Sequence, residues 1–190
     1  YDGIYLLPSS NYNTFDNITV YGHSERGIDM EGSTNTFNNI NASGNVEGIF
    51  VGFGVSGAIF NNIIISSNPN YGIHITSSFS NSFTNITSSN NGKGIYAVSS
   101  NDNNITNALM NDQLYLLSST YNNLQNIDVS NQFIFVNNAS SNNLANAYIH
   151  NIGGNGLTID TVYSNIIDNA TISGNANGIV SVDSSANTIK

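Results

Sequence analysis

The chain has 190 residues, of which 39% are hydrophobic and only 8% are charged, and its formal charge is −9. Three basic side chains cannot neutralise a run of phosphates, so the composition excludes nucleic-acid binding and attachment to an anionic membrane surface. No apolar run is long enough for membrane insertion as a helix, and the lack of Cys excludes disulfides, thiolate catalysis and Cys-ligated metals.

A Gly-apolar step begins each unit of an internal repeat. The apolar residues are Ile4, Ile28, Ile49, Ile73, Ile95, Leu114, Ile134, Leu157 and Ile179, and Gly precedes seven of the nine. The residue two positions later is apolar in eight of nine units, which indicates a short strand with one buried face. A polar turn, such as residues 99–102, follows this predicted strand.

After the turn comes a second apolar anchor, which has Asn two residues before it in eight of nine units and Asn two residues after it. These anchors are Phe15, Phe37, Phe60, Phe83, Ile105, Leu124, Leu144, Ile167 and Ile189, spaced roughly 22 residues apart. Each begins a second β segment, such as residues 85–87. A loop rich in Gly and Asn, such as residues 89–93, then returns the chain to the next Gly-apolar step.

A repeat of this length indicates a solenoid, because a unit that cannot bury its own apolar face must stack on its neighbours. Stacking pairs each strand in parallel with its equivalents in the coils on either side. We therefore predict an all-β fold, a parallel β-helix of about eight to nine coils that forms a single domain over residues 1–190. The pattern starts and stops part-way through a unit, so we expect the chain to be a mature piece of a longer repeat protein.

The Gly-Ile-x-Val/Leu and Asn-x-Phe/Ile-x-Asn-Ile segments resemble the right-handed parallel β-helix repeats of the pectate-lyase-like and NosD-like families. The resemblance covers all 190 residues and is strongest to the Asn-rich repeats of large surface-layer and sheath proteins of archaea and bacteria. It implies a right-handed helix and a place in the cell envelope.

The Asn residues that follow each anchor are predicted to form a structural ladder, in which stacked amides hydrogen-bond from coil to coil. They are Asn17, Asn39, Asn62, Asn85, Asn107, Asn126, Asn146 and Asn169. Six Asn-x-Ser/Thr sequons occur, and three of them coincide with this ladder. The other three, Asn41, Asn104 and Asn138, are the candidate glycosylation sites.

Asp29, Glu31 and Glu47 are predicted to lie close together on the second and third coils. Two interpretations remain open for them, namely solvated surface charge and a Ca²⁺ site formed by their carboxylates. Sugar hydrolases need paired carboxylates, and lyases that act on acidic sugars also need Lys or Arg. Because only Arg26 lies nearby and no basic groove is present, we expect no catalytic residues, no cofactor and no enzymatic activity.

The position after each Gly-apolar step is predicted to point away from the core. It is aromatic in five of nine units, at Tyr5, Phe50, Tyr96, Tyr115 and Phe135. Three interpretations remain open: an interface for lateral packing against another β-helix, a platform on which sugar rings stack, or core residues if the predicted register is shifted by one.

Our first hypothesis is a non-catalytic structural protein of the cell exterior, which self-associates through the ends of the β-helix and through the aromatic face. The alternative is a carbohydrate-binding or carbohydrate-processing β-helix module. The expected partners are other copies of the chain and cell-surface glycans, with no nucleic acid and no membrane insertion.

Overall fold

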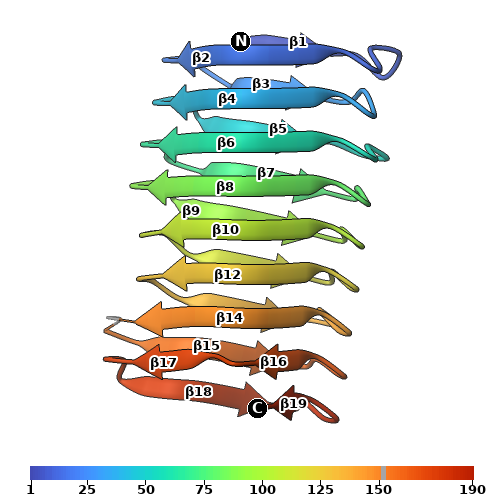
Figure 1. Ribbon diagram of the computed structural model, residues 1–190. Coiled ribbons are helices and arrows are strands. Elements are labelled where there is room, and N and C mark those ends of the chain that lie inside the picture. Colours follow the sequence, from blue (N-terminus) through green and yellow to red (C-terminus); the bar gives the residue numbers. More distant parts are fainter. Residues whose placement is uncertain (151–152) are drawn as a thin grey trace.

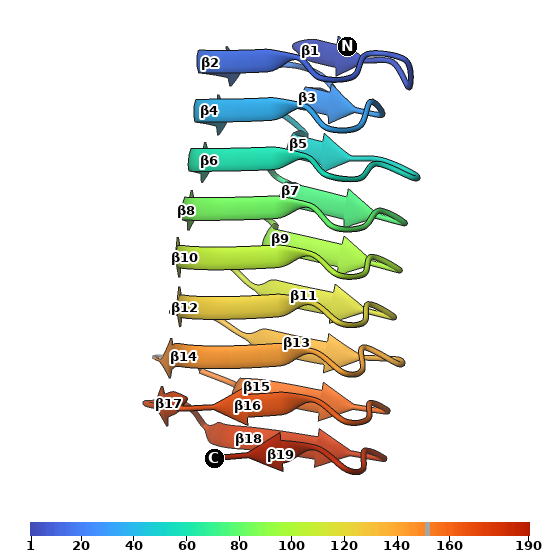
Figure 2. The same cartoon turned by 45° about the vertical axis from the view of Figure 1, so that its right-hand side comes forward.

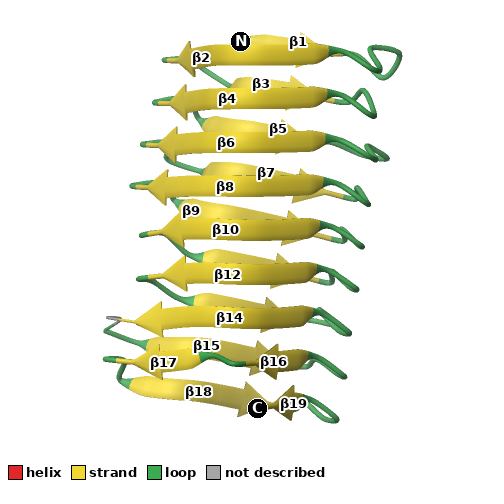
Figure 3. Cartoon of the chain, viewed as in Figure 1, coloured by secondary structure: helices red, strands yellow, loops and turns green. Residues whose placement is uncertain are grey.

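The computed structural model describes residues 1–150 and 153–190, and in these ranges the chain consists of strands and loops with no helix (Figure 3). The strands stack coil upon coil from the N-terminal to the C-terminal end (Figure 1). This arrangement confirms the predicted parallel β-solenoid, with about 8 turns of roughly 22 residues. No helix in the described part of the chain is long and apolar enough to cross a membrane.

Each coil contributes one strand to each of two sheets, which face one another across the core, except that one coil contributes both β16 (Ile166–Asp168) and β17 (Thr171–Ser173) to the second sheet (Figure 2). In the described residues, sheet A contains β1 (Ile4–Leu6), β3 (Arg26–Met30), β5 (Glu47–Val51), β7 (Tyr71–Thr76), β9 (Lys93–Val98), β11 (Leu114–Leu117), β13 (Phe133–Val136), β15 (Asn155–Asp160) and β18 (Asn177–Val182). Sheet B contains β2 (Thr14–Tyr21), β4 (Thr36–Ser43), β6 (Ile59–Ser66), β8 (Ser82–Ser89), β10 (Asn104–Met110), β12 (Asn123–Val129), β14 (Asn143–His150), β16 (Ile166–Asp168), β17 (Thr171–Ser173) and β19 (Thr188–Ile189). The strands of the described residues pair in parallel throughout, as stacked coils require.

The predicted anchors of the second motif form the centre of the core. Phe15, Phe37, Phe60 and Phe83 stack ring on ring, with centroid separations of 4.7, 4.8 and 5.0 Å. In the later coils the same register is taken by Ile105, Leu124, Leu144 and Ile167, which are buried, and by Ile189 in the last coil, which is 51% exposed. The sheet pairing therefore brings like residues of successive coils together without any local contact in sequence.

The predicted Asn ladder is confirmed along sheet B. Each of its eight members has φ between 53° and 57°, a left-handed conformation that Asn tolerates better than most residues. From Asn39 to Asn169, the side-chain amide of each ladder residue donates to the amide oxygen of the preceding one at 2.8–3.1 Å. At the N-terminal end Asn39 donates to Asp16 rather than to Asn17. These residues bend each long strand of sheet B, which gives the coil a third side.

The Asn residues that precede the anchors form a second, buried ladder at the turn between the sheets. From Asn81 to Asn165 the backbone N–H and the side-chain amide of each member donate to the next member's amide oxygen. A third ladder, not predicted from the sequence, runs through Asn45, Asn68, Asn91 and Asp112. These ladders satisfy corner groups that would otherwise be buried without a hydrogen bond.

The glycine of each Gly-apolar step is required by the close approach of neighbouring coils. A Cβ added at Gly48 would lie 2.6 Å from the carbonyl oxygen of Gly72, and one at Gly72 would lie 2.6 Å from that of Gly94. Both also meet the core side chain of Ile65, at 3.0 and 2.9 Å. The glycine therefore faces inward at a corner, and the residue before it lies on the outer surface.

One coil departs from the predicted register. Phe133, not Ile134, pairs with Leu114 and Leu157, so Phe133 and Phe135 point into the core and Ile134 points outward. The prediction of Phe135 as an outward aromatic residue was therefore wrong. This coil has no Gly-Ile step to mark the start of its strand, and Phe-Ile-Phe-Val is apolar in either register.

Candidate functional site

The polar and aromatic side chains best placed to bind or react with a ligand lie on the outer surface of sheet A. We call this surface the sheet A face. Two rows of residues run along it, because strand pairing aligns equivalent positions from coil to coil. The first row contains Arg26, Glu47, Tyr71 and Lys93. The second contains Tyr5, Asp29, Phe50, His74, Tyr96 and Tyr115.

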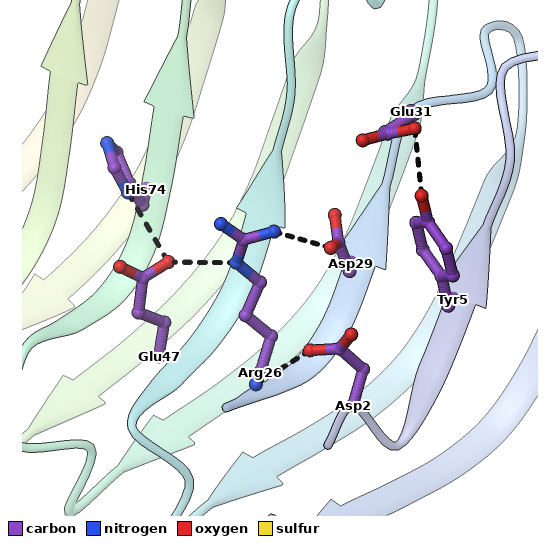
Figure 4. Close-up of polar contacts among 7 residues, drawn as sticks. All are labelled: Asp2, Tyr5, Arg26, Asp29, Glu31, Glu47 and His74. Carbon is purple, nitrogen blue, oxygen red and sulfur yellow. Dashed lines mark hydrogen bonds and ion pairs between the residues drawn. The ribbon is translucent and has the colours of Figure 1, made fainter. Parts of the chain in front are cut away.

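Arg26 is the centre of a polar network on this face (Figure 4). Its guanidinium forms an ion pair with Asp29, and its Nε lies 3.5 Å from Oε2 of Glu47. His74 approaches the same Glu47 oxygen through Nδ1, at 3.4 Å. The guanidinium also lies 3.6 Å from the centroid of the Phe50 ring, a cation–π contact that holds the arginine against the sheet.

Asp29 is the carboxylate in the most unusual environment. Only 5% of the residue is exposed, and its Oδ1 is buried without a hydrogen-bond partner in the structure. Burial raises the pKa of Asp29 above its ordinary value, although the hydrogen bond and charge of Arg26 act in the opposite direction. A buried carboxylate oxygen with no partner calls for an explanation in terms of water, a ligand or a catalytic role.

Glu31 lies apart from the arginine and pairs with the neighbouring coil. The hydroxyl of Tyr5 donates to Oε2 of Glu31 over 3.1 Å, and this hydrogen bond is the main cause of the raised pKa of Tyr5. On the other side, Oδ1 of Asp2 accepts from the backbone N–H of Arg26 at 3.0 Å. Figure 4 shows the two arrangements side by side across β1 and β3.

The predicted Ca²⁺ candidate is wrong. Among the residues that the structure describes, no group of three or more His, Asp or Glu side chains could hold a metal ion. The guanidinium of Arg26 lies between Asp29 and Glu47, where a cation would have to bind, and Glu31 is turned toward Tyr5. The three acids lie on neighbouring coils as predicted, but a built-in arginine neutralises two of them.

A tyrosine cluster continues the sheet A face beyond the Arg26 network. Tyr71 and Tyr96 are stacked with their centroids 4.9 Å apart, and Tyr115 follows at 5.5 Å from Tyr96. Burial raises the pKa of both Tyr96 and Tyr115. His74 packs against Tyr71 and Tyr96 at 4.6 and 5.3 Å, and so connects the cluster to the Arg26 network.

The outward aromatic residues predicted from the sequence fall into three groups. Tyr96 and Tyr115 are half-buried members of the tyrosine cluster, and Tyr5 is 51% exposed. Phe50 points outward but is only 5% exposed, because Arg26 and His74 cover its ring. Phe135 lies in the core, as described above.

Tyr71 and Lys93 were not predicted from the sequence as members of this face. Strict alternation from the apolar anchor places the residue two positions earlier on the inward side. The inward-facing glycine breaks that alternation, so the residue before it emerges on the outer surface. The signal that could have found them is the close approach that the repeated glycine indicates.

The three candidate glycosylation sites differ in accessibility. Asn138 is exposed in the turn between β13 and β14, with φ 68°. Asn104 lies within β10 and its amide oxygen accepts from Asn123, while Asn41 lies within β4 with its amide oxygen buried. Glycosylation stays a prediction, and Asn138 is the acceptor that the geometry favours.

Surface pockets formed by the described residues include one beside the Arg26 network and one over sheet B. One of ≈ 250 Å³ adjoins the Arg26 network and is lined by Ser24, Glu25, Arg26, Val46 and Glu47. The other, of ≈ 320 Å³, lies over sheet B and is lined by Asn39, Ile40, Asn41, Asn62, Ile63, Ile64, Asn85 and Thr87. The ≈ 250 Å³ pocket offers space for a ligand beside the carboxylates of Glu25 and Glu47.

Comparison with known proteins identifies the family. A family model described as right-handed β-helix region matches residues 2–113. The chain belongs to this family. No curated protein sequence matches it significantly.

Solved structures similar to the chain include the catalytic domain of a GH87 alpha-1,3-glucanase. One complex with tetrasaccharides matches at 13% identity and a TM-score of 0.51, and two complexes with nigerose match at 14% and 13% identity with TM-scores of 0.53 and 0.51. Each match covers 98% of this chain and 50% of the other, so the chain spans about half the length of these domains. At this level of identity the likeness shows the fold.

The expectation of a chain without enzymatic activity is corrected by this comparison. The coil stack that matches almost the whole chain is that of catalytic domains acting on a glucan. We expected no catalysis because basic residues are scarce. That scarcity counts against lyases that act on acidic sugars. Hydrolysis of a glycosidic bond needs carboxylates instead, and the sheet A face carries them.

Proposed function

We propose that the chain is a carbohydrate-processing β-helix module that binds a glycan along the sheet A face. The observation that carries this proposal is the position of paired carboxylates beside a cluster of half-buried tyrosines on one surface. Tyrosine rings offer flat faces for sugar rings, and their hydroxyls offer hydrogen bonds. The similar solved domains, whose glycan ligands are a tetrasaccharide and nigerose, support the same class of ligand.

The reaction that this surface supports best is cleavage of a glycosidic bond by Asp29 and Glu47. Such cleavage needs one carboxylic acid to protonate the leaving oxygen and one carboxylate to activate water or to attack the sugar. Burial of Asp29 raises its pKa, which favours the protonated form needed by the acid. Glu47, paired with Arg26 and His74 beside the ≈ 250 Å³ pocket, supplies the carboxylate.

A glycan reaches Asp29 when the side chain of Arg26 moves off the Phe50 ring. About a third of that side chain, 31%, is already exposed, so only the remaining part loses its packing against the sheet when it moves. The hydroxyl groups of a sugar can replace the arginine as hydrogen-bond partners of the Asp29 carboxyl, whose Oδ1 has none. In this proposal Arg26 positions the two carboxylates in the free protein and gives way to the glycan at Asp29.

Release of reducing sugar from a panel of soluble polysaccharides, including an alpha-1,3-glucan, tests the proposal. We expect Glu47→Gln to lower the rate at least about 100-fold while glycan binding persists, as for the loss of an acid–base group. Asp168→Asn is the matched control, because Asp168 is exposed on sheet B, away from the sheet A face. Its rate should equal that of the unaltered chain.

Binding is measured separately from cleavage, by affinity electrophoresis in gels that contain each polysaccharide. Tyr96→Ala and Tyr115→Ala should reduce retardation, because each removes a ring of the tyrosine cluster. Retardation without sugar release would refute the assignment of Asp29 and Glu47 and leave carbohydrate binding in place. Neither retardation nor release with any polysaccharide would refute the proposed function.

Self-association outside the cell remains a second proposal. The observation in its favour is the exposure of three large apolar side chains in one outward row of sheet B: Ile64, Leu109 and Tyr148 are 52%, 52% and 43% exposed, with Thr87 and Asp128 between them. Exposed apolar patches of this kind mark interaction surfaces. Light scattering after gel filtration measures the mass in solution, and a strict monomer at high concentration would exclude this proposal.

A further inference from the structure

Lys93 is held in an unusual position within the tyrosine cluster. Its Nζ lies 5.5, 5.4 and 5.7 Å from the ring centroids of Tyr71, Tyr96 and Tyr115. All three distances fall within the range of cation–π attraction. The ammonium group is therefore fixed on the sheet A face by rings from three successive strands, β7, β9 and β11.

The charge of Lys93 is not compensated by a neighbouring acid. In residues 1–150 and 153–190, no carboxylate lies within ion-pair distance of its ammonium group, whereas Arg26 contacts two. The acid in its own row, Glu47, is two strands away, which corresponds to roughly 10 Å, and it is already engaged by Arg26 and His74. Lys93 thus leaves a positive charge on the face of a protein whose net charge is −9.

The groups around Lys93 also favour an anion. None of the hydroxyls of Tyr71, Tyr96 and Tyr115 donates to another group in the described structure, so all three are available as hydrogen-bond donors. An ammonium group and phenol hydroxyls that donate to no carboxylate match the oxygens of a carboxylate or a sulfate ester. The acid that acts on the cluster is Asp160, whose charge contributes to the raised pKa of Tyr115 but which forms no hydrogen bond or ion pair with Tyr115 or Lys93 in the described residues.

We propose that Lys93 and the tyrosine cluster form a subsite for a single anionic substituent, a carboxylate or sulfate ester, carried by an otherwise neutral glycan. The inference rests on the proposed function and adds the class of sugar that the face selects. Glu47 and Glu31, which lie two and three coils from Lys93 toward the N-terminal end, repel further negative charges along the same glycan. The arrangement therefore selects a sparsely substituted chain over a polyanion.

Titration of the whole chain, with isotope-labelled tyrosine observed by NMR, tests the subsite. The probes are glucuronate, methyl glucoside as its neutral counterpart, and inorganic sulfate. We expect glucuronate and sulfate to shift the ring signals of Tyr71, Tyr96 and Tyr115, with glucuronate binding about tenfold more tightly than methyl glucoside. Raising the salt concentration should weaken glucuronate binding and leave methyl glucoside unaffected.

Variants assign the effect to the ammonium group. Lys93→Gln should reduce the affinity for glucuronate to that for methyl glucoside, and Lys93→Arg should retain the preference. Lys190→Gln is the matched control, since Lys190 is an exposed lysine outside sheet A, and it should leave both affinities unchanged. Circular dichroism spectra and melting curves of each variant establish that the fold is intact.

Three results would overturn the inference. Equal affinities for glucuronate and methyl glucoside, or a preference that survives in Lys93→Gln, would remove the subsite and leave the proposed glycan binding intact. No shift of the tyrosine signals with glucuronate or sulfate would also remove it. The polysaccharide panel described above then decides the proposed function on its own.

Discussion

The stack of four phenylalanine rings in the core offers a direct test of how coil stacking stabilises the protein. Phe60 has a stacked ring on both sides, at 4.8 Å from Phe37 and 5.0 Å from Phe83, whereas Phe83 has a stacked ring on one side and Ile105 on the other. Both side chains are completely buried. The two positions therefore differ mainly in the number of ring pairs.

Replacement by leucine separates the ring pairs from burial. Leu124 and Leu144 occupy the same register and are fully buried, so leucine fits this layer of the core. Phe60→Leu removes two ring pairs and Phe83→Leu removes one. At about 0.5–1.5 kcal/mol for each pair, we expect Phe60→Leu to lower the free energy of unfolding by that amount more than Phe83→Leu. Phe60→Ala should cost about 3–5 kcal/mol, because it also leaves a cavity.

Urea denaturation at constant temperature, followed by far-UV circular dichroism, measures these differences. The slope of the free energy with urea must stay the same among the variants for the comparison to hold. If Phe83→Leu destabilises as much as Phe60→Leu, ring stacking contributes nothing beyond burial. If Phe60→Ala costs less than about 1 kcal/mol, the phenylalanine layer is not the packed core that the structure indicates.

Three further predictions concern the corners and the site. Gly72→Ala should destabilise by about 1–3 kcal/mol in the same urea assay, because its Cβ would meet the Gly94 carbonyl oxygen at 2.6 Å, while Gly154→Ala, with open space around it, should change stability little. Asn85→Ala should lower the free energy of unfolding by about 1–2 kcal/mol, because it removes two amide hydrogen bonds and places alanine at a left-handed φ. Asn85→Gly should lower it less, because glycine accepts that φ. Equal losses in the two variants would contradict a role for the backbone conformation. The raised pKa of Asp29 means that the folded state binds its proton more tightly than the unfolded state, so the Asp29 contribution to stability should fall as pH rises from the ordinary Asp pKa through the raised one. Melting temperatures of the unaltered chain and of Asp29→Asn at several pH values test this, and a difference that does not change with pH would refute it.

The sequence alone was sufficient to predict the coil stack. Phe37, Phe60 and Phe83 recur at nearly constant spacing, and that spacing is itself the strand-pairing register, since parallel coils align equivalent residues. The ladder from Asn39 to Asn169 followed from the same repetition. In a solenoid each contact between coils is repeated in the chain, so periodicity carries information that is usually available only from the tertiary structure.

The candidate site was predicted only in part, because its residues do not repeat. Asp29, Glu31 and Glu47 were predicted on neighbouring coils with Arg26 nearby, but the repeat pattern does not indicate that Arg26 lies between two of them or that Glu31 pairs with Tyr5. Those pairings depend on which way long side chains turn on a flat face. Alternation in sequence cannot specify that direction.

What the sequence determined by itself is the scaffold: the parallel β-solenoid, the phenylalanine layer and the Asn ladder from Asn39 to Asn169. The tertiary structure decided which side chains meet on its surface. It moved Phe135 into the core, because Phe-Ile-Phe-Val is apolar in both registers, and it brought Lys93 outward beside Tyr71 and Tyr96, because the glycine at the corner faces inward. The order of apolar and polar residues determines which side chains are buried, whereas the surface chemistry of this protein depends on contacts between side chains of different coils.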